Sequence, residues 1–170
     1  MSFTFNSQLD FHESETNPLD CIEDILAAHD WRYKRASHTE LTLTLKGQHS
    51  GYRMFFIWQH DMSALLICIQ YDLQIAPAHF AEAAKTLMDI NTETWMGHFD
   101  LPADTATPGY RYTMIIPDPQ NPAQSMIEKA IDIALTHCER FYPAFHLLAE
   151  TEKPCRETLP LALMETMGNS

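Results

Sequence analysis

Two consecutive apolar segments constrain the fold most, because each predicts a strand with large apolar side chains on both of its faces. In residues 52–58, four large side chains alternate on one face, while Phe55 and Ile57 occupy the other. Residues 65–69 repeat this pattern. One apolar face can pack on helices of this chain, and the other needs a terminal segment, the final helix or a second subunit to cover it.

The helix-like and strand-like segments on either side of these two strands predict an α+β fold. It consists of an antiparallel β-meander plus a hairpin packed with helices, in the order α-ββββ-α-ββ-α-α. Asn17 followed by Pro18 and Asp20 predicts a capped helix start, and the helix should run to about His29. Four strand-like segments follow, joined by short polar connections that favour antiparallel pairing. Two further strands are expected over residues 96–101 and 110–116.

Three more helices are expected. The second begins at Pro77 and ends near Thr94, and the third follows Asn121 and is bent or ended by Pro143. A short final helix is expected over residues 161–167. The apolar stripe of the second helix is predicted to comprise Phe80, Ala84, Leu87 and Asn91, flanked by Ala83 and Ile90.

The chain of 170 residues fits one domain, which we expect at residues 17–170 after a mobile tail at residues 1–16. No apolar run reaches the roughly 18 residues that indicate a membrane span, and no secretory signal is apparent. The four cysteines are widely spaced, as in reduced proteins. These features predict a cytoplasmic protein that does not insert into membranes.

The charge and motif content exclude several functions. A formal net charge of −12 disfavours nucleic acid and anionic lipid as partners, and the five dispersed glycines form no phosphate-binding loop. The nine histidines are scattered singletons without metal-ligand spacing, and no nucleophile motif occurs. We therefore expect no cofactor, no metal and no catalytic residue.

One pair of residues keeps an enzymatic alternative open. His98 and Asp100 are two residues apart on a predicted strand, so their side chains share a face, and Arg111 could be an anion partner there. The simpler interpretation is a hairpin in which the pair meets Arg111 or solvent. The alternative is a small-ligand binder or an enzyme that uses this pair.

The run Trp95 to Asp100 is the densest unusual segment. It places a large aromatic residue, a flexible glycine and the His98–Asp100 pair at a helix-to-strand junction, where Gly97 permits a positive φ angle. Core packing is the simpler interpretation of Trp95 and Phe99. Recognition of a partner is the alternative.

This run, together with the segments at 17–25, 55–73, 138–145 and 163–168, resembles the YbjN-domain family, which is named for regulators of bacterial sensory transduction. The similarity extends from about Pro18 to Gly168. It implies a fold similar to that of type III secretion chaperones, with a helix, a meander, a helix, a hairpin and a long helix. The family offers no catalytic residues to transfer.

The sequence thus predicts a non-enzymatic, cytoplasmic regulatory or chaperone-like module that acts through protein contacts. Its partner is another protein or a second copy in a homodimer. The residues predicted to contact the partner are Trp95, Gly97, His98, Phe99, Asp100, Phe55 and Ile57.

Overall fold

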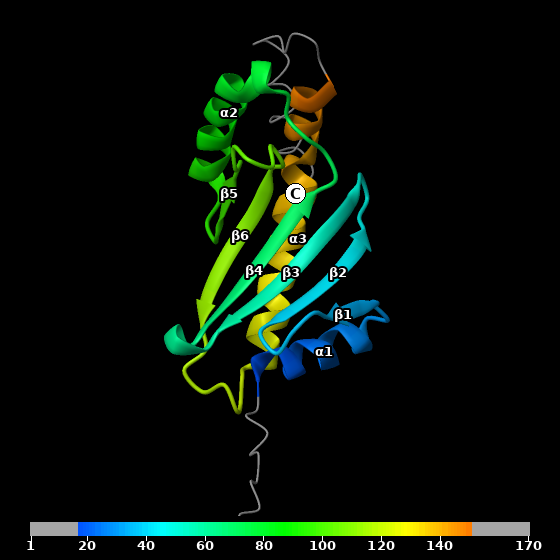
Figure 1. The fold of residues 1–170 in the computed structure, drawn as a ribbon, viewed down its shortest axis with the longest axis vertical. Coiled ribbons are helices and arrows are strands. Elements are labelled where there is room, and N and C mark those ends of the chain that lie inside the picture. Colours follow the sequence, from blue (N-terminus) through cyan, green and yellow to red (C-terminus); the bar gives the residue numbers. More distant parts are fainter. Residues whose placement is uncertain (1–16, 151–170) are drawn as a thin grey trace, which may run out of the picture.

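The computed structural model describes residues 17–150, which form one six-stranded antiparallel sheet and three α-helices (Figure 1). The α+β class and the predicted order of elements are confirmed over this range. The tail predicted at 1–16 and the final helix predicted at 161–167 lie outside the described residues.

The sheet has the strand order β1-β2-β3-β4-β6-β5, so the hairpin of β5 and β6 joins the meander through β6. The strands are β1 (Tyr33–Arg35), β2 (Glu40–Lys46), β3 (Gly51–Gln59), β4 (Ala64–Tyr71), β5 (His98–Asp100) and β6 (Gly109–Ile115). The helices are α1 (Pro18–Ala28), α2 (Phe80–Glu93) and α3 (Gln124–Glu150), and two short 3₁₀ helices are η1 (His60–Met62) and η2 (Pro77–His79).

Helix α1 begins at the predicted cap. The Asn17 side chain accepts a hydrogen bond from the Leu19 amide at 3.0 Å, and the Asp20 carboxylate accepts one from the Asn17 amide at 3.3 Å. Together these bonds form a capping box. The Asn17 side-chain amide also donates to the carbonyl of His38, which ties the helix start to the turn between β1 and β2.

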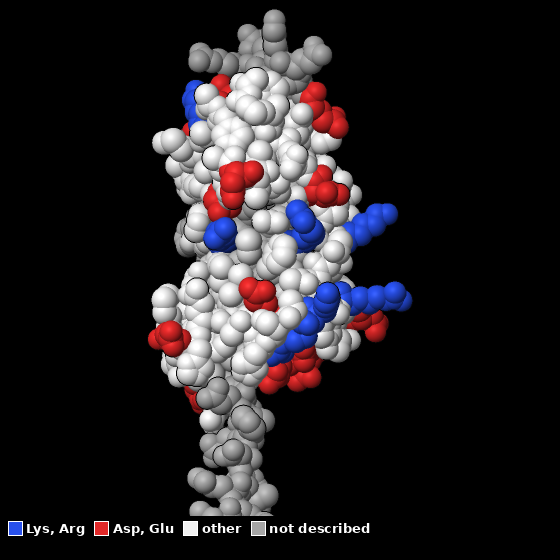
Figure 2. Space-filling view, in the orientation of Figure 1, with Lys and Arg blue, Asp and Glu red and all other residues white. Residues whose placement is uncertain are grey.

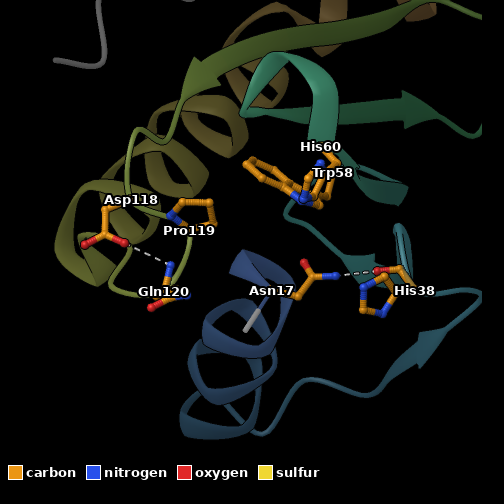
Figure 3. Close-up of a pocket in the computed structure, with 7 residues that line it drawn as sticks. All are labelled: Asn17, His38, Trp58, His60, Asp118, Pro119 and Gln120. Atoms are coloured by element: carbon orange, nitrogen blue, oxygen red, sulfur yellow. Dashed lines mark hydrogen bonds between the residues drawn. The ribbon is translucent and has the colours of Figure 1, made fainter. Parts of the chain in front are cut away.

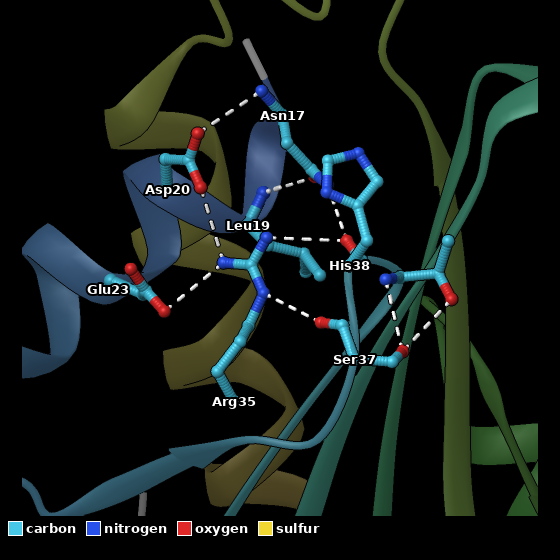
Figure 4. Close-up of polar contacts among 8 residues, drawn as sticks. Asn17, Leu19, Asp20, Glu23, Arg35, Ser37 and His38 are labelled. Carbon is cyan, nitrogen blue, oxygen red and sulfur yellow. Dashed lines mark hydrogen bonds and ion pairs between the residues drawn. The ribbon is translucent and has the colours of Figure 1, made fainter. Parts of the chain in front are cut away.

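Arg35 strengthens the same connection (Figure 4). One nitrogen of its guanidinium group lies 3.2 Å from Asp20 and 3.1 Å from Glu23, both on α1. The other two donate to the carbonyls of Ser37 and His38. A planar guanidinium suits this fork of acceptors, so α1 is held against the β1–β2 turn.

The core lies between one face of the sheet and the helices. Tyr71 on β4 is fully enclosed, and its hydroxyl donates to the carbonyl of Cys138 on α3 at 2.8 Å. The rings of Phe99 and Phe145 contact that of Tyr71, and Phe141 packs in turn against Phe99. Each such buried ring contributes roughly 1.5–3 kcal/mol, so this cluster fixes α3 across the sheet.

Helix α3 excludes one of the two predicted effects of Pro143, which was expected to bend or to end the helix. Pro143 does not end the helix, which continues to Glu150. Proline removes one backbone hydrogen bond, but the turn that follows it buries Ala144, Phe145 and Leu148 in the core. Burial of those side chains outweighs the local preference to stop.

The second helix differs from the prediction in its first turn and in which side chains it buries. The helix opens with the 3₁₀ turn η2, and its buried side chains are Ala83, Thr86 and Ile90. The predicted stripe is therefore displaced around the helix, and its central residues are only half-buried or exposed.

Strand β5 covers three residues instead of six, because Gly97 has a φ angle of +70°, which ends the strand on that side.

Candidate functional site

The side of the sheet that faces away from α3 carries most of the predicted contact residues. Figure 1 shows α3 running behind the strands, and we call the side turned toward the viewer the open face. Directly paired residues of neighbouring strands project on the same face. One row across the open face comprises Lys34, Thr42, Phe55, Cys68, Arg111 and His98.

An apolar strip occupies the centre of this face. Phe55 and Ile57 on β3 and Leu66 on β4 are half-buried, and Ile115 at the end of β6 is 62% exposed. Within residues 17–150, the helices contribute to the core on the opposite side of the sheet. The strip is the second apolar face that the sequence predicted.

Asp100 and Arg111 form an ion pair at one side of the open face, with 2.6 Å between Arg111 Nε and Asp100 Oδ2. They are diagonal neighbours, since Asp100 pairs with Gly109 and His98 pairs with Arg111. A Cβ at position 109 would lie 3.0 Å from the Ile69 carbonyl and 3.4 Å from an Asp100 oxygen, and only the first of these contacts is tight. The close packing at Gly109 is therefore against the backbone of β4 and not against the ion pair.

The ion pair between Asp100 and Arg111 weighs against the alternative of a small-ligand binder or enzyme that uses His98 and Asp100. The Asp100 carboxylate is engaged by Arg111, and His98 is exposed on the same face. The arrangement matches the simpler interpretation, in which the pair meets Arg111 and solvent. The nearby Cys68 thiol has its pKa raised, chiefly by burial, which disfavours the reactive thiolate.

The loop between α2 and β5 presents Trp95 to solvent. Its side chain is 97% exposed, whereas Phe99 is 1% exposed. Core packing is thus the correct interpretation for Phe99 and the wrong one for Trp95. An exposed indole is a strong potential anchor for a partner, because it offers a large apolar surface and one hydrogen-bond donor.

Three contacts hold this loop in place. Asn91 on α2 bonds to the backbone of Phe99 in both directions, at 2.7 Å and 3.0 Å. The Tyr110 hydroxyl donates to the carbonyl of Met96. Gly97 fits closely, since a Cβ there would lie 2.5 Å from the Arg111 carbonyl and from the Tyr110 hydroxyl. The absence of a side chain at Gly97 therefore allows the close packing that fixes the loop carrying Trp95.

The open face includes residues that sequence reasoning did not assign to the site. Beside Phe55 lie the exposed basic side chains Arg32, Lys34 and Arg53. The period-2 alternation of residues 31–34 was a local signal for two of them. Their approach to Arg53 depends on the pairing of β1, β2 and β3, which is not a local property of the sequence.

A separate pocket of about 260 Å³ lies near the start of α1 (Figure 3). Several of its polar groups already serve the fold. The Asn17 side chain caps α1 and bonds to His38, and the Asp118 carboxylate accepts from the Gln120 amide at 3.1 Å. We therefore consider this pocket a structural junction.

Among residues 17–150, no group of three or more His, Cys, Asp or Glu side chains is placed to hold a metal ion. In the same range, no helix is both long enough and apolar enough to cross a membrane.

The comparisons with known proteins point to one family. The family described as "YbjN: Putative bacterial sensory transduction regulator" matches residues 18–147. A solved structure described as "Crystal structure of YbjN, a putative transcription regulator from E. coli" is similar in fold, with a TM-score of 0.52 and 11% sequence identity. The similarity covers 73% of this chain and 90% of that one. No curated protein matches the chain in sequence.

Proposed function

Because this chain belongs to the YbjN family of putative bacterial sensory transduction regulators, we propose that it is a non-enzymatic regulator that acts by binding another protein. The observation that carries the proposal is the apolar strip on the open face. Phe55, Ile57 and Leu66 lie only half-buried there, on a sheet whose helices pack against its other side. Apolar patches of this kind mark interaction surfaces.

Trp95 supports the same role from outside the strip. The backbone of the loop that carries Trp95 is already held in place before binding, so a partner that covers the exposed indole has to order only its side chain. His98 lies three residues later on the open face. We propose that Trp95 and the strip contact the partner as two parts of one interface.

We propose that the partner is a different protein. Two copies that met with the two-fold axis at the β1–β3 side of the open face would bring their basic residues toward each other, because residues near the axis of such an interface face their own counterparts. Arg32, Lys34 and Arg53 would then repel their counterparts. A chaperone-like grip on a segment of another protein does not carry this cost.

The test compares the full-length wild-type chain with Ile57→Asp, using Ser125→Asp on α3 as the charge-matched control. Light scattering gives the oligomeric state, and quantitative capture from the native host compares the bound proteins. We expect a monomer whose specific partner is lost with Ile57→Asp and kept with Ser125→Asp. Equal capture by all three chains, with circular dichroism showing intact folds, would refute the proposal.

A further inference from the structure

A groove runs along β2 on the open face. Its floor carries the short side chains Thr42 and Thr44, while longer side chains rise from β1 on one side and β3 on the other. Neighbouring strands are about 4.8 Å apart, so the two walls are separated by roughly 10 Å. The pocket here has a volume of about 500 Å³, and its lining on the open face includes Arg32, Lys34, Thr42, Thr44, Arg53 and Phe55.

The walls of this groove carry unneutralised positive charge. Within residues 17–150, the side chains of Arg32, Lys34 and Arg53 have no acidic partner, unlike Arg35 and Arg111, which form ion pairs. Figure 2 shows basic side chains gathered over the region of β1 and β2. Three such cations around one groove are conspicuous in a chain with a net charge of −12.

The groove is also apolar on one side. Phe55 forms part of the β3 wall, and Ile57 continues the apolar strip along the same strand. Arg53 and Phe55 are two residues apart on β3, so a positive charge and an aromatic ring are spaced roughly 6.8 Å apart along this wall. An extended chain has the same spacing between alternate side chains.

We propose that this groove binds an acidic segment of the partner protein, in extended conformation, whose carboxylates meet Arg32, Lys34 and Arg53 and whose apolar side chains contact Phe55. The inference rests on the proposed function and specifies the partner's chemistry. Opposite charges at this surface would speed association and fix the register of the bound segment. The acidity of the rest of the chain disfavours nucleic acid as the occupant.

The probe is a fluorescein-labelled ten-residue peptide in which glutamate alternates with leucine, with a glutamine–leucine peptide as its neutral counterpart. Fluorescence anisotropy with the full-length chain measures the affinity. We expect the acidic peptide to bind despite the net negative charge of the protein, and the neutral peptide to bind at least tenfold more weakly. Raising NaCl from about 50 to about 300 mM should weaken the acidic peptide's binding, because exposed charges are screened.

The matched variants are Lys34→Glu/Arg53→Glu in the groove and Lys85→Glu/Lys129→Glu on α2 and α3, which change the net charge equally. We expect the groove variant to weaken peptide binding by roughly tenfold or more and the control to change it less than about twofold. Equal effects of the two variants, or no binding by the wild type, would overturn the inference.

Two further outcomes distinguish this inference from the proposed function. If Ile57→Asp abolishes partner capture while Lys34→Glu/Arg53→Glu leaves it unchanged, protein binding at the open face stands and the acidic-segment inference fails. The second outcome concerns a fluorescein-labelled 20-base-pair DNA duplex. If the wild type binds this duplex and Lys34→Glu/Arg53→Glu does not, the groove recognises phosphates and the inference is also overturned.

Discussion

The side-chain amide of Asn91 pairs with the backbone of Phe99 as a neighbouring strand would. Its oxygen accepts from the Phe99 amide at 2.7 Å, and its nitrogen donates to the Phe99 carbonyl at 3.0 Å. Strand β5 is the last strand of the sheet, so this contact satisfies the outer edge of its central residue. Helix α2 is thereby attached to the loop that presents Trp95.

Replacing Asn91 should loosen this loop. Asn91→Ala removes both hydrogen bonds and leaves backbone groups of Phe99 without partners, which costs roughly 1–3 kcal/mol of unfolding free energy. Denaturant unfolding measures this cost, and hydrogen exchange at the Phe99 amide should accelerate. Met88→Ala, at a position 69% exposed on α2, is the control and should change little. Unchanged exchange at Phe99 would contradict the role assigned to Asn91.

Gly97→Ala should be destabilising for two reasons. The φ angle of +70° strains any residue with a Cβ, and that Cβ would meet the Arg111 carbonyl and the Tyr110 hydroxyl at 2.5 Å. We expect a loss of roughly 1–3 kcal/mol of unfolding free energy in denaturant titrations. A stability equal to that of the wild type would show that the loop adopts another conformation.

Two glycines of the β2–β3 hairpin offer a matched comparison. A Cβ at Gly47 would lie 1.9 Å from a Glu139 oxygen and 2.2 Å from the Tyr52 ring, whereas one at Gly51 would meet nothing nearer than 3.9 Å. Gly47→Ala should therefore cost roughly 1–3 kcal/mol, and Gly51→Ala much less. Thermal unfolding of the two variants checks the difference, and a larger loss from Gly51→Ala would contradict this packing.

His137 should make the fold sensitive to mild acid. Burial, and then the charge of Arg140, lower the pKa of this imidazole below its ordinary value of 6.5. The neutral ring is therefore favoured in the folded state, and its stabilising contribution is present above pH 6.5 and declines as the pH falls through and below that value. The ring stacks on Tyr110 and Phe141, so phenylalanine can replace it.

The measurement for His137 is the melting temperature between pH 7.5 and pH 5. We expect His137→Phe to lose less thermal stability than the wild type over this range, because it has no proton to take up. Parallel curves for the two proteins would show that His137 titrates equally in the folded and unfolded states.

Trp95→Ala should separate binding from stability. The side chain is 97% exposed, so its removal should change the unfolding free energy by less than about 0.5 kcal/mol. We expect partner capture to fall at least tenfold, as for a large aromatic anchor. Undiminished capture would remove Trp95 from the proposed interface.

Local signals predicted much of the fold. The cap at Asn17 and the period-2 alternation of the strands depend on neighbouring residues, and the structure has both. The course of α3 through Pro143 could not be predicted in this way, since it follows from packing of residues 144–148 against distant strands. Local rules fail where tertiary burial outweighs them.

The candidate site was predicted only in part. The alternation of β3 identified Phe55 and Ile57 as a second apolar face, and the run at 95–100 drew attention to Trp95. Whether an aromatic residue in that run points outward depends on the backbone turn at Gly97, which propensity does not reveal. The groove depends on the register of three strands, which the sequence alone did not provide.

Site-specific photocrosslinking tests the central claim most directly. A benzophenone amino acid replaces Thr113, an exposed open-face residue of β6, or Lys129, an exposed residue of α3, in the full-length protein in its native host. Binding at the open face predicts a discrete protein adduct from position 113 and none from position 129. An adduct from position 129 with none from position 113 would contradict it.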